Sequence, residues 1–422
     1  MSTVSRRDFL RTAGLVAGAG ILGGCATGTS SNGGNGGKLV LQSSLSDPDP
    51  KAALRTIAGD YSGKVTLNTV AIEQFRAQLP TYLSSGNPPD VLTWYGGSVA
   101  RDYASKGLLL DVSDLWRGDG PCASYSPALK QLSTSDDGKQ IFVPTNFYWW
   151  GVFYRKSAFA KWGVKPPTTW DEFLGLCENL KAKKVHPLTM GTASTPWTAS
   201  GWFDYLNLRI NGPKFHRELL AGKHKFDSEQ VRAVMDHFGK LLPYFDPDGR
   251  SYAWQQAVTP LVRNEAAMYL IGAFITTAVP ADVVDDLDFF QFPIIDPNQP
   301  IAEEAPTDGY FASAKTKDPA ATKKLLTYLA TPKTQQQYIE LSKSSNLPTS
   351  SEVDTSTFSP LVQKGIALLN KADEITQFFN RDSSDELQTT ADTALTRFID
   401  KPKDVSAILA EWQSSAGRVF TS

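Results

Sequence analysis

The feature that most constrains the fold is a regular alternation of apolar strands and amphipathic helices that begins near residue 38. The pattern predicts strands at 38–44, 64–70 and 89–94, and helices at 50–62, 73–84 and 98–107. Strands that alternate with helices form βαβ units with a parallel sheet. Because ligands bind beyond the carboxyl ends of such strands, we expect a binding edge at 42–46 and 94–97, which includes Gln42 and Trp94.

The remainder of the chain is long enough for a second lobe. The segment from residue 38 to residue 422 exceeds the roughly 250–300 residues that one hydrophobic core usually serves. An extended, aromatic stretch at 140–156 places Asn146, Tyr148 and Trp150 on one face at period two. Strands are predicted at 268–276 and 289–295, and a helix is predicted to begin after Thr169 as its N-cap. Further helices are expected at 319–330, 334–342, 359–370, 385–399 and 404–420.

The first 37 residues are expected to lie outside this fold. Residues 1–24 join a positively charged stretch to an apolar run shorter than the roughly 20 residues that span a bilayer. The residues around Arg6 and Arg7 resemble a twin-arginine export signal, and the sequence that ends at Cys25 resembles a lipobox. We therefore expect a lipid on Cys25, a flexible tether at 25–37, and a protein held at the outer face of the cell membrane.

Composition and motifs argue against several classes of function. A formal net charge of −2 does not suit nucleic acid, and the four His lack metal-ligand spacing. The sequence has no nucleophile elbow and no P-loop, and its one G-x-G-x-x-G, at 18–23, lies in the leader rather than between a strand and a helix. We expect no enzyme, no cofactor, no metal and no catalytic residue. Cys122 and Cys177 could form a disulfide outside the cell, although a lone helical Cys177 is more typical of a buried apolar group.

A series of short motifs runs in order along nearly the whole chain after the leader. They are Gly86–Val91, Tyr103–Leu109, Val143-Pro144, Val152–Lys156, Gly163, Pro166–Phe173, Asn264–Met268, Ala320-Ala321 and Leu347–Thr349. Together they resemble the bacterial extracellular solute-binding proteins of sugar-uptake ABC transporters, the group that contains maltose-binding protein. Arg155 stands where Asn is usual, and Asn264-Glu265 stands where Gly-Lys is usual. Both departures read as surface changes.

The resemblance implies a two-lobed α/β fold, each lobe a mostly parallel sheet flanked by helices, with the ligand in the cleft between them. It implies chain crossings near 143–148 and 296–306. Lobe 1 would then hold 38–143 plus 306–350, and lobe 2 would hold 144–305 plus 351–422. The expected protein is a monomer that delivers a carbohydrate to the permease subunits of a transporter.

Sugars present apolar C–H faces rimmed by hydroxyls, so their sites combine aromatic platforms with planar polar groups. Aligned on the motifs, the resemblance implies these ligand-binding residues: Trp94, Tyr148, Trp197, Phe274, Asp308, Arg381 and Asp382. Gln42 is added from the predicted strand end, and Asn146 from the face that it shares with Tyr148. Tyr148 falls where maltose-type members often carry an acidic residue, which argues against maltose. Core packing is the alternative reading for each aromatic residue, and a surface ion pair is the alternative for Arg381 and Asp382.

Two other functions remain open at this stage. A surface-anchored glycoside hydrolase would need a pair of carboxylates, and no pair stands out in the sequence. A receptor for a charged solute such as a phosphodiester would need matching buried charge, for which Arg381 is a candidate. The abundance of Trp, ten residues in all, favours a neutral sugar.

Overall fold

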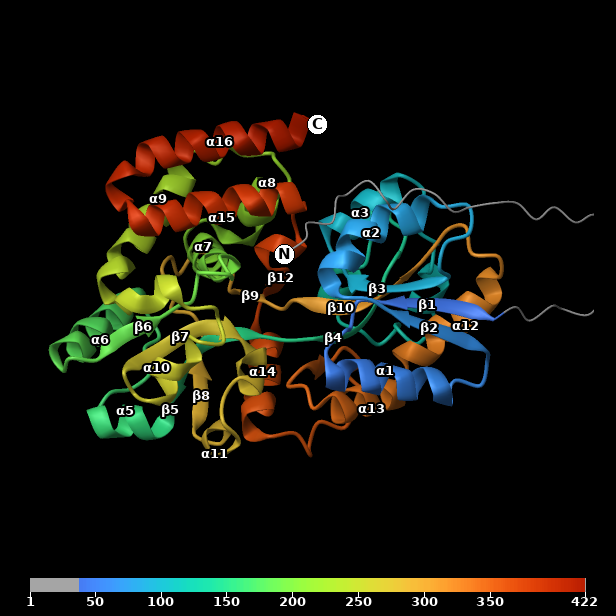
Figure 1. Cartoon of the computed structure of the whole chain (residues 1–422), viewed down its shortest axis with the longest axis horizontal. Coiled ribbons are helices and arrows are strands. Elements are labelled where there is room, and N and C mark those ends of the chain that lie inside the picture. The colour runs from blue at the N-terminus through green and yellow to red at the C-terminus, as the bar shows by residue number, and fades with distance from the viewer. Residues whose placement is uncertain (1–37, 422) are drawn as a thin grey trace, which may run out of the picture. The chain divides into compact units, whose positions relative to one another are not determined.

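A computed structural model of the protein describes residues 38–421, and these residues form an α/β fold with two lobes (Figure 1). The predicted export signal, the predicted lipidation site Cys25 and the predicted tether lie outside the described residues. The strands are β1 (Leu39–Ser43), β2 (Val65–Thr69), β3 (Val91–Tyr95), β4 (Val143–Phe147), β5 (Trp150–Arg155), β6 (His186–Thr189), β7 (Ala266–Gly272), β8 (Leu287–Phe290), β9 (Ala302–Glu304), β10 (Thr307–Ala312), β11 (Leu347–Pro348) and β12 (Glu374–Thr376).

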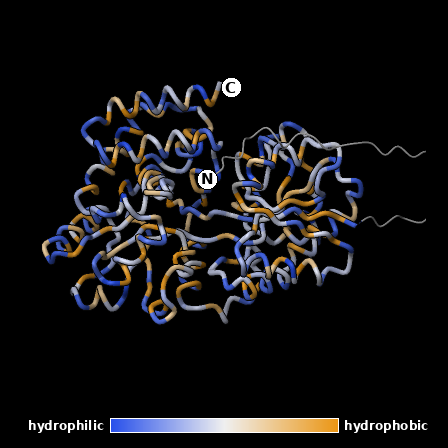
Figure 2. The backbone as a smooth tube through the Cα atoms, in the orientation of Figure 1, coloured by the Kyte–Doolittle hydropathy of each residue, from blue (hydrophilic) through white to orange (hydrophobic). Residues whose placement is uncertain are grey.

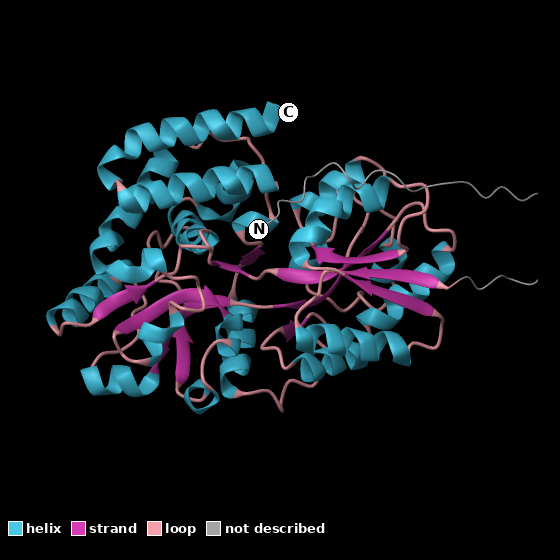
Figure 3. Cartoon of the chain, viewed as in Figure 1, coloured by secondary structure: helices cyan, strands magenta, loops and turns pink. Residues whose placement is uncertain are grey.

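Helices cover both faces of the sheets (Figure 3). The longer ones are α1 (Pro48–Asp60), α2 (Ile72–Ser84), α3 (Ser98–Ser105), α6 (Trp170–Ala182), α7 (Trp197–Ile210), α8 (Gly212–Leu220), α9 (Glu229–Leu241), α12 (Pro319–Ala330), α13 (Pro332–Ser342), α14 (Pro360–Lys371), α15 (Asp385–Asp400) and α16 (Val405–Thr421). The shorter ones are α4 (Pro127–Leu132), α5 (Lys156–Trp162), α10 (Val258–Val262) and α11 (Ala281–Val284), with 3-10 turns η4 (Ala273–Thr277) and η5 (Phe379–Arg381) next to the site described below.

The first lobe is built on a six-stranded sheet in the order β11-β4-β10-β3-β1-β2. Helices α2 and α3 lie on one face of it, and α1 and α13 lie on the other (Figure 1). The second lobe has a four-stranded sheet in the order β6-β7-β5-β8, and β12 pairs with β9 as a separate two-stranded sheet. The chain passes from the first sheet to the second between β4 and β5, and it returns between β9 and β10. The exact division of the chain between the lobes stays a prediction.

The two-lobed α/β architecture is confirmed, but the expectation of mostly parallel sheets is wrong. β1 runs parallel to β2 and β3, whereas β10 runs antiparallel to both β3 and β4, and β11 antiparallel to β4. In the four-stranded sheet of the second lobe β5 is antiparallel to β7 and β8, and β6 is parallel to β7, while the separate β9–β12 pair is parallel. The reason is the crossings: strands that arrive from the other lobe enter the sheet from the opposite end.

The elements expected from the alternation in the first lobe are confirmed to within a few residues at each end. The N-cap of α6 is confirmed too, because the Thr169 hydroxyl accepts the Glu172 amide while the Glu172 carboxylate accepts the Thr169 amide, a capping box. Two strands end earlier than predicted. The stretch at 268–276 leaves the sheet after Gly272 and turns into η4, and β8 ends at Phe290.

Buried apolar side chains from the strands and helices form the core of each lobe. Hydrophobic segments alternate with hydrophilic ones along the backbone of both lobes (Figure 2). Cys122 lies in a first-lobe cluster and Cys177 in the second-lobe core, and both are buried free thiols. The disulfide that the sequence left open is therefore not formed, because the two residues belong to different cores.

Candidate functional site

A cavity of about 360 Å³ lies between the two lobes. Its walls come from segments far apart in the chain. They are Ile72 and Arg76 of α2, Tyr95 at the end of β3, Tyr148 and Trp150 at the first crossing, Trp197 at the start of α7, Phe274 in η4, and Phe378, Asn380 and Arg381 at η5. Because each lobe supplies part of the wall, a relative movement of the lobes would open or close this space.

Aromatic rings on the second-lobe side of the cavity pack on one another. Trp150 stacks on Phe378 with 4.7 Å between ring centroids. Trp197 meets Trp150, Phe274 and Phe378 edge to face, at 6.2, 6.1 and 6.0 Å. Tyr148 contacts Phe274 edge to face at 5.5 Å. Trp197, Phe274 and Tyr148 remain partly exposed, whereas Trp150 is 1% exposed. The partly exposed rings therefore offer flat apolar faces on a rigid aromatic base.

A glycine in α7 makes room for the most buried of these rings. A Cβ atom at Gly201 would lie 2.7 Å from Cζ3 of Trp150 and 3.4 Å from a ring carbon of Phe378. Since real Cβ atoms do not approach so closely, α7 can cover the Trp150–Phe378 stack because residue 201 has no side chain. The orientation of the aromatic base thus depends on the small residue one turn after Trp197.

Arg381 is the main cation at the cavity, and an anion already pairs with it. Its Nη1 lies 2.5 Å from Oδ1 of Asp308, and its guanidinium carbon lies 4.7 Å from the ring centre of Tyr95 and 5.5 Å from that of Tyr148. Burial tends to lower the pKa of Arg381, but the Asp308 carboxylate and the two phenols outweigh it, and the net pKa is raised. Arg381 stays charged, and Asp308 compensates its charge.

The second cation, Arg76, is also paired. Its Nη2 donates to the Tyr95 hydroxyl at 2.6 Å, and its Nη1 lies 3.2 Å from the carboxylate of Asp385 on α15. Burial raises the pKa of Tyr95, and burial raises the pKa of Tyr148 to about 12. Both phenols are therefore neutral at physiological pH and can donate as well as accept hydrogen bonds.

The structure brings four of the predicted residues to the cavity wall: Tyr148, Trp197, Phe274 and Arg381. Asp308 does not line it but lies behind Arg381 as its ion-pair partner. The expected common face of residues 146, 148 and 150 holds for Tyr148 and Trp150. Asn146 instead points elsewhere, is 6% exposed, and accepts from the side-chain amide of Asn346 at 2.6 Å.

Trp94 is a correction. It is 4% exposed and lies in a first-lobe cluster, stacked on Phe75 of α2 at 5.3 Å and on Tyr95 at 4.2 Å. It lines a neighbouring cavity along α2 and α3 rather than the space between the aromatic rings. The reason is that α2 packs over residue 94, so the next residue, Tyr95 at the strand end, reaches the inter-lobe cavity instead.

Gln42 and Asp382 are also placed away from the cavity wall. Gln42 is 5% exposed within β1. Asp382 is 7% exposed and accepts the backbone N–H of Ser98, the first residue of α3, at 2.8 Å, with Arg101 at 3.3 Å. Gly97, the residue before α3, has φ +109°, and a Cβ atom on Gly97 would lie 2.8 Å from Asp382 Oδ1. Asp382 is therefore a cap for α3, a role that favours a carboxylate at a helix N-terminus.

Sequence reasoning did not single out several wall residues: Ile72, Arg76, Trp150, Phe378, Asn380, and Tyr95, although Tyr95 lies within the predicted binding edge at 94–97. Trp150 could have been found, because it shares the face of Tyr148 at period two. Phe378 and Asn380 flank the predicted Arg381 in sequence and could have been included with it. Nothing in the sequence marks Ile72 or Arg76, because their place depends on how α2 packs on the sheet.

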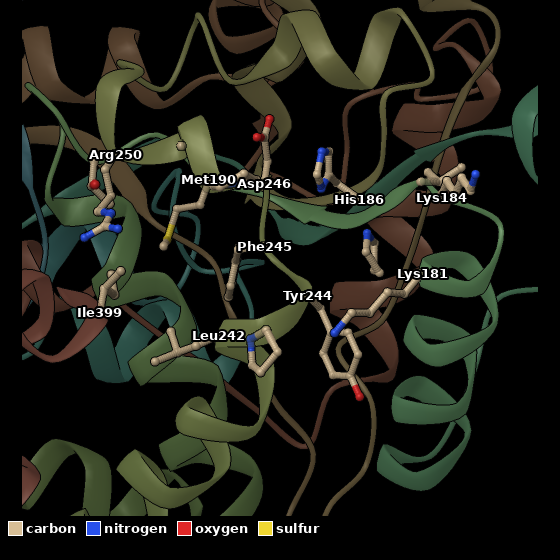
Figure 4. A pocket seen from close by; sticks show the side chains of 16 residues that line it. Lys181, Lys184, His186, Met190, Leu242, Tyr244, Phe245, Asp246, Arg250 and Ile399 are labelled. Carbon is tan, nitrogen blue, oxygen red and sulfur yellow. The ribbon is translucent and has the colours of Figure 1, made fainter. Parts of the chain in front are cut away.

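A larger cavity of about 590 Å³ lies within the second lobe (Figure 4). Met190, Leu242 and Phe245 line its middle, with basic side chains such as Lys181 and Lys184 toward its edge. Two of its wall polar groups have partners: Arg250 pairs with Asp400, and the Tyr244 hydroxyl donates to Glu178. All its residues come from one lobe or its C-terminal helices, so lobe movement would not enclose a ligand there.

Residues 38–421 carry neither a metal-site cluster nor a membrane-spanning helix. In this part of the chain, no group of three or more His, Cys, Asp and Glu residues could hold a metal ion. Among the described helices, none combines the length and the apolar character needed to cross a bilayer.

Comparison with known proteins gives matches over most of the chain. A probable sugar-binding periplasmic protein of Mesorhizobium japonicum is 26% identical over 304 residues, covering 70% of each chain. An uncharacterized ABC transporter extracellular-binding protein of Pyrococcus horikoshii is 23% identical over 299 residues, 70% of this chain and 66% of the relative. The aligned region therefore spans about two thirds of the length of these curated relatives.

A solved structure agrees over nearly the whole described fold. The bacterial solute receptor AcbH, described as having an exclusive preference for β-D-galactopyranose, superimposes with a TM-score of 0.83 at 28% identity, covering 91% of this chain and 98% of that one. The family model described as bacterial extracellular solute-binding protein matches residues 48–336, more than half of the chain. With the two-lobed fold and the cavity between the lobes, these matches show that the chain belongs to the bacterial extracellular solute-binding protein family.

Proposed function

We propose that this protein binds a neutral monosaccharide in the aromatic cavity between its lobes and delivers it to the permease of a sugar-uptake ABC transporter. The observation that carries the proposal is the wall itself: partly exposed rings of Tyr148, Trp197 and Phe274 face one space together with charge-compensated arginines. Rings of this kind stack on the C–H faces of a pyranose, and the paired polar groups suit its hydroxyls.

The charge balance of the cavity favours a neutral ligand. Arg381 is paired with Asp308, and Arg76 is paired with Asp385. An anionic ligand would have to compete with these carboxylates and would bring a second negative charge near each of them. A receptor for a phosphodiester would instead need cations that are free to pair with the ligand.

The glycoside hydrolase hypothesis receives no support from the wall. Hydrolysis requires two carboxyl groups that flank the scissile bond. None of the residues that line the cavity, within the described part of the chain, is Asp or Glu. The family relationship favours a receptor that returns its ligand unchanged.

The size of the cavity and one relative favour a single hexose. A volume of about 360 Å³ is near the lower end of the roughly 300–1,000 Å³ typical of small-molecule sites. AcbH, at 28% identity, is described as specific for β-D-galactopyranose. D-galactose is therefore our first candidate.

Several finer parts of the proposal rest on the sequence. Export through the twin-arginine signal, cleavage before Cys25 and a lipid on that residue would hold the protein on the outer face of the membrane, as a monomer. The division of the chain into 38–143 plus 306–350 and 144–305 plus 351–422 would let the lobes close over the sugar.

Calorimetry at neutral pH tests the proposal with matched pairs of ligands. D-galactose is compared with D-galacturonate, which keeps the ring and adds a carboxylate, and with lactose and raffinose, which add further rings. We expect one molecule of a hexose to bind per protein and the acid to bind at least tenfold more weakly. Tighter binding of galacturonate would replace the neutral-sugar assignment with a charged ligand, and hydrolysis of lactose would replace the receptor with an enzyme.

A further inference from the structure

Two buried carboxyl groups lie near the cavity but are not among the residues that line it. Asp204 is in the middle of α7 and Glu304 is the last residue of β9, and both are 0% exposed. Their carboxyl groups face each other closely enough to share a hydrogen bond. Such a pair is unexpected, because buried carboxylates are normally paired with cations.

Donors for this pair are missing. Asp204 Oδ2 accepts the backbone N–H of Phe379 at 2.9 Å, but Asp204 Oδ1 and both carboxyl oxygens of Glu304 receive no hydrogen bond when the two groups are ionised. The nearest cation, Arg209, is used by Glu303 and by the carbonyls of Phe292 and Ala302. Two acceptors that face each other without a donor require a proton between them.

Histidine does not supply this proton. The His216 ring on α8 has Nε2 at 3.9 Å from Asp204 Oδ1, which is beyond hydrogen-bond distance. The Asn207 amide oxygen accepts from Asn211, so the NH₂ group of Asn207 faces His216 Nδ1 at 3.0 Å. His216 Nδ1 therefore accepts this hydrogen bond, which favours the neutral ring. Burial lowers the pKa of His216 to about 3, and the ring therefore stays uncharged at neutral pH.

The surroundings place the proton on Glu304. Asp204 has the Phe379 amide to stabilise its ionised form, whereas Glu304 has no comparable donor. Burial raises the pKa of Asp204 to about 7, with the nearby Asp382 adding to the rise. Burial, followed by the charges of Asp204 and Glu303, raises the pKa of Glu304 well above its ordinary value, against the lowering effect of Arg209.

The pair is connected to the ligand-facing segment at residues 378–381. Phe379, whose amide Asp204 accepts, is flanked by Phe378, Asn380 and Arg381, which line the cavity. Glu304 ends β9, which pairs with β12 directly before this segment, and the Ala305 amide donates to the Thr376 carbonyl at 2.9 Å. The carboxyl pair therefore joins α7, a crossing strand and the segment that carries Arg381.

We propose that above neutral pH Asp204 and Glu304 share one proton, and that this carboxyl pair is the positioning group that holds segment 378–381 against the cavity. Loss of the proton would leave two anions facing each other, and the segment bound through Phe379 would loosen. Binding of a sugar by Phe378, Asn380 and Arg381 would then weaken at alkaline pH although none of these residues titrates there.

The first experiment needs no ligand. Equilibrium unfolding in urea is measured between pH 7.5 and 8.5 for the wild type, Glu304→Gln, and the exposed control Glu352→Gln. A raised folded-state pKa contributes stability that is present at low pH and is lost as pH rises, because the unfolded chain releases the proton near pH 4. The wild type and control should lose about tenfold in folding equilibrium constant per pH unit relative to Glu304→Gln. Equal slopes in the wild type and Glu304→Gln would overturn the shared proton.

The second experiment tests positioning by amide hydrogen exchange of the segment around Phe379. Asp204→Asn keeps an acceptor for the Phe379 amide and a donor for Glu304, whereas Asp204→Leu keeps neither. We expect near-normal exchange in the Asn variant and at least tenfold faster exchange in the Leu variant, with β1 unchanged in both. If Asp204→Leu does not fold, Asp204→Ser, whose side chain is too short for the bond, replaces it. Unchanged exchange in the Leu or Ser variant would overturn the positioning role.

A third experiment measures sugar affinity and rests on the proposed function. Galactose affinity at pH 7.5 should be near normal for Asp204→Asn and at least tenfold weaker for Asp204→Leu. Equal affinity in these two variants would count against positioning. A wild type that binds no galactose would contradict the proposed sugar alone, since the unfolding and exchange experiments judge the carboxyl pair without a ligand.

Discussion

The guanidinium of Arg381 is held 2.5 Å from the carboxylate of Asp308, so η5 of the second lobe's C-terminal segment pairs with β10 of the first-lobe sheet. Both side chains are largely buried, with 17% and 28% exposed. Because the pair sets the charge of the cavity, it should decide which ligands the protein accepts.

Asp308→Asn should change the ligand preference rather than abolish the fold. Removing the carboxylate leaves Arg381 charged without its partner, since its pKa is raised and it cannot lose its proton. We expect weaker binding of a neutral hexose by roughly five- to fiftyfold, about 1–2.5 kcal/mol, and improved binding of galacturonate. Calorimetry with both ligands measures the change. An Asp308→Asn protein with the wild-type ratio of the two affinities would show that the ion pair does not set specificity.

Trp197→Ala should lower sugar affinity more than stability. The ring is partly exposed at the start of α7 and lines the cavity, and stacking on a pyranose should contribute about 1–3 kcal/mol, roughly five- to 150-fold in Kd. Loss of its edge-to-face contacts should lower the apo melting temperature slightly.

The matched control for that variant is Trp202→Ala in the same helix. Trp202 is 0% exposed in the second-lobe core, so its removal should cost about 3–5 kcal/mol of stability while the folded fraction binds sugar normally. The two variants should therefore separate affinity from melting temperature. If Trp197→Ala melts as low as Trp202→Ala and keeps its affinity, Trp197 is a core residue and leaves the proposed site.

Gly201→Ala should disturb the aromatic base of the cavity. The new Cβ would lie 2.7 Å from Trp150, whose ring is 1% exposed and cannot swing into solvent. We expect a destabilisation of about 1–3 kcal/mol and a changed tryptophan fluorescence spectrum in the apo protein. Gly175→Ala in α6, where a Cβ meets nothing within 4 Å, is the control and should be neutral or slightly stabilising. Equal melting temperatures for the two variants would mean that Trp150 can move aside.

Cys25→Ser should release the protein from the membrane fraction. The prediction follows from the resemblance of the sequence that ends at Cys25 to a lipobox, which implies that the Cys25 thiol accepts a lipid anchor. Fractionation with an antibody to the protein provides the measurement, and the cleaved N-terminus is checked by mass. Cys122→Ser, at a buried free thiol, is the control and should stay with the membrane. Retention of a cleaved Cys25→Ser protein on the membrane would refute the lipid anchor.

Part of the secondary structure could be predicted from the sequence because it depends on the chemistry of neighbouring residues. The alternation over 38–107 predicted β1, α1, β2, α2, β3 and α3, because hydrophobic period and turn residues act over a few neighbours. The Thr169 cap and the bounds of α12, at 319–330, were predicted for the same reason. Trp197, Tyr148 and Arg381, which line the cavity, were named from the family resemblance of the motifs along the chain.

Tertiary structure decided the rest, because it depends on residues distant in the chain. Trp94 is in the core since Phe75 of α2 packs on it, while Tyr95, one residue on, reaches the cavity. The direction of β10 in the first sheet follows from its return across the lobes and not from its own residues. Asp204 and Glu304 are a hundred residues apart in the chain, and no local pattern could predict that two carboxyl groups are buried side by side, where we propose that they share a proton.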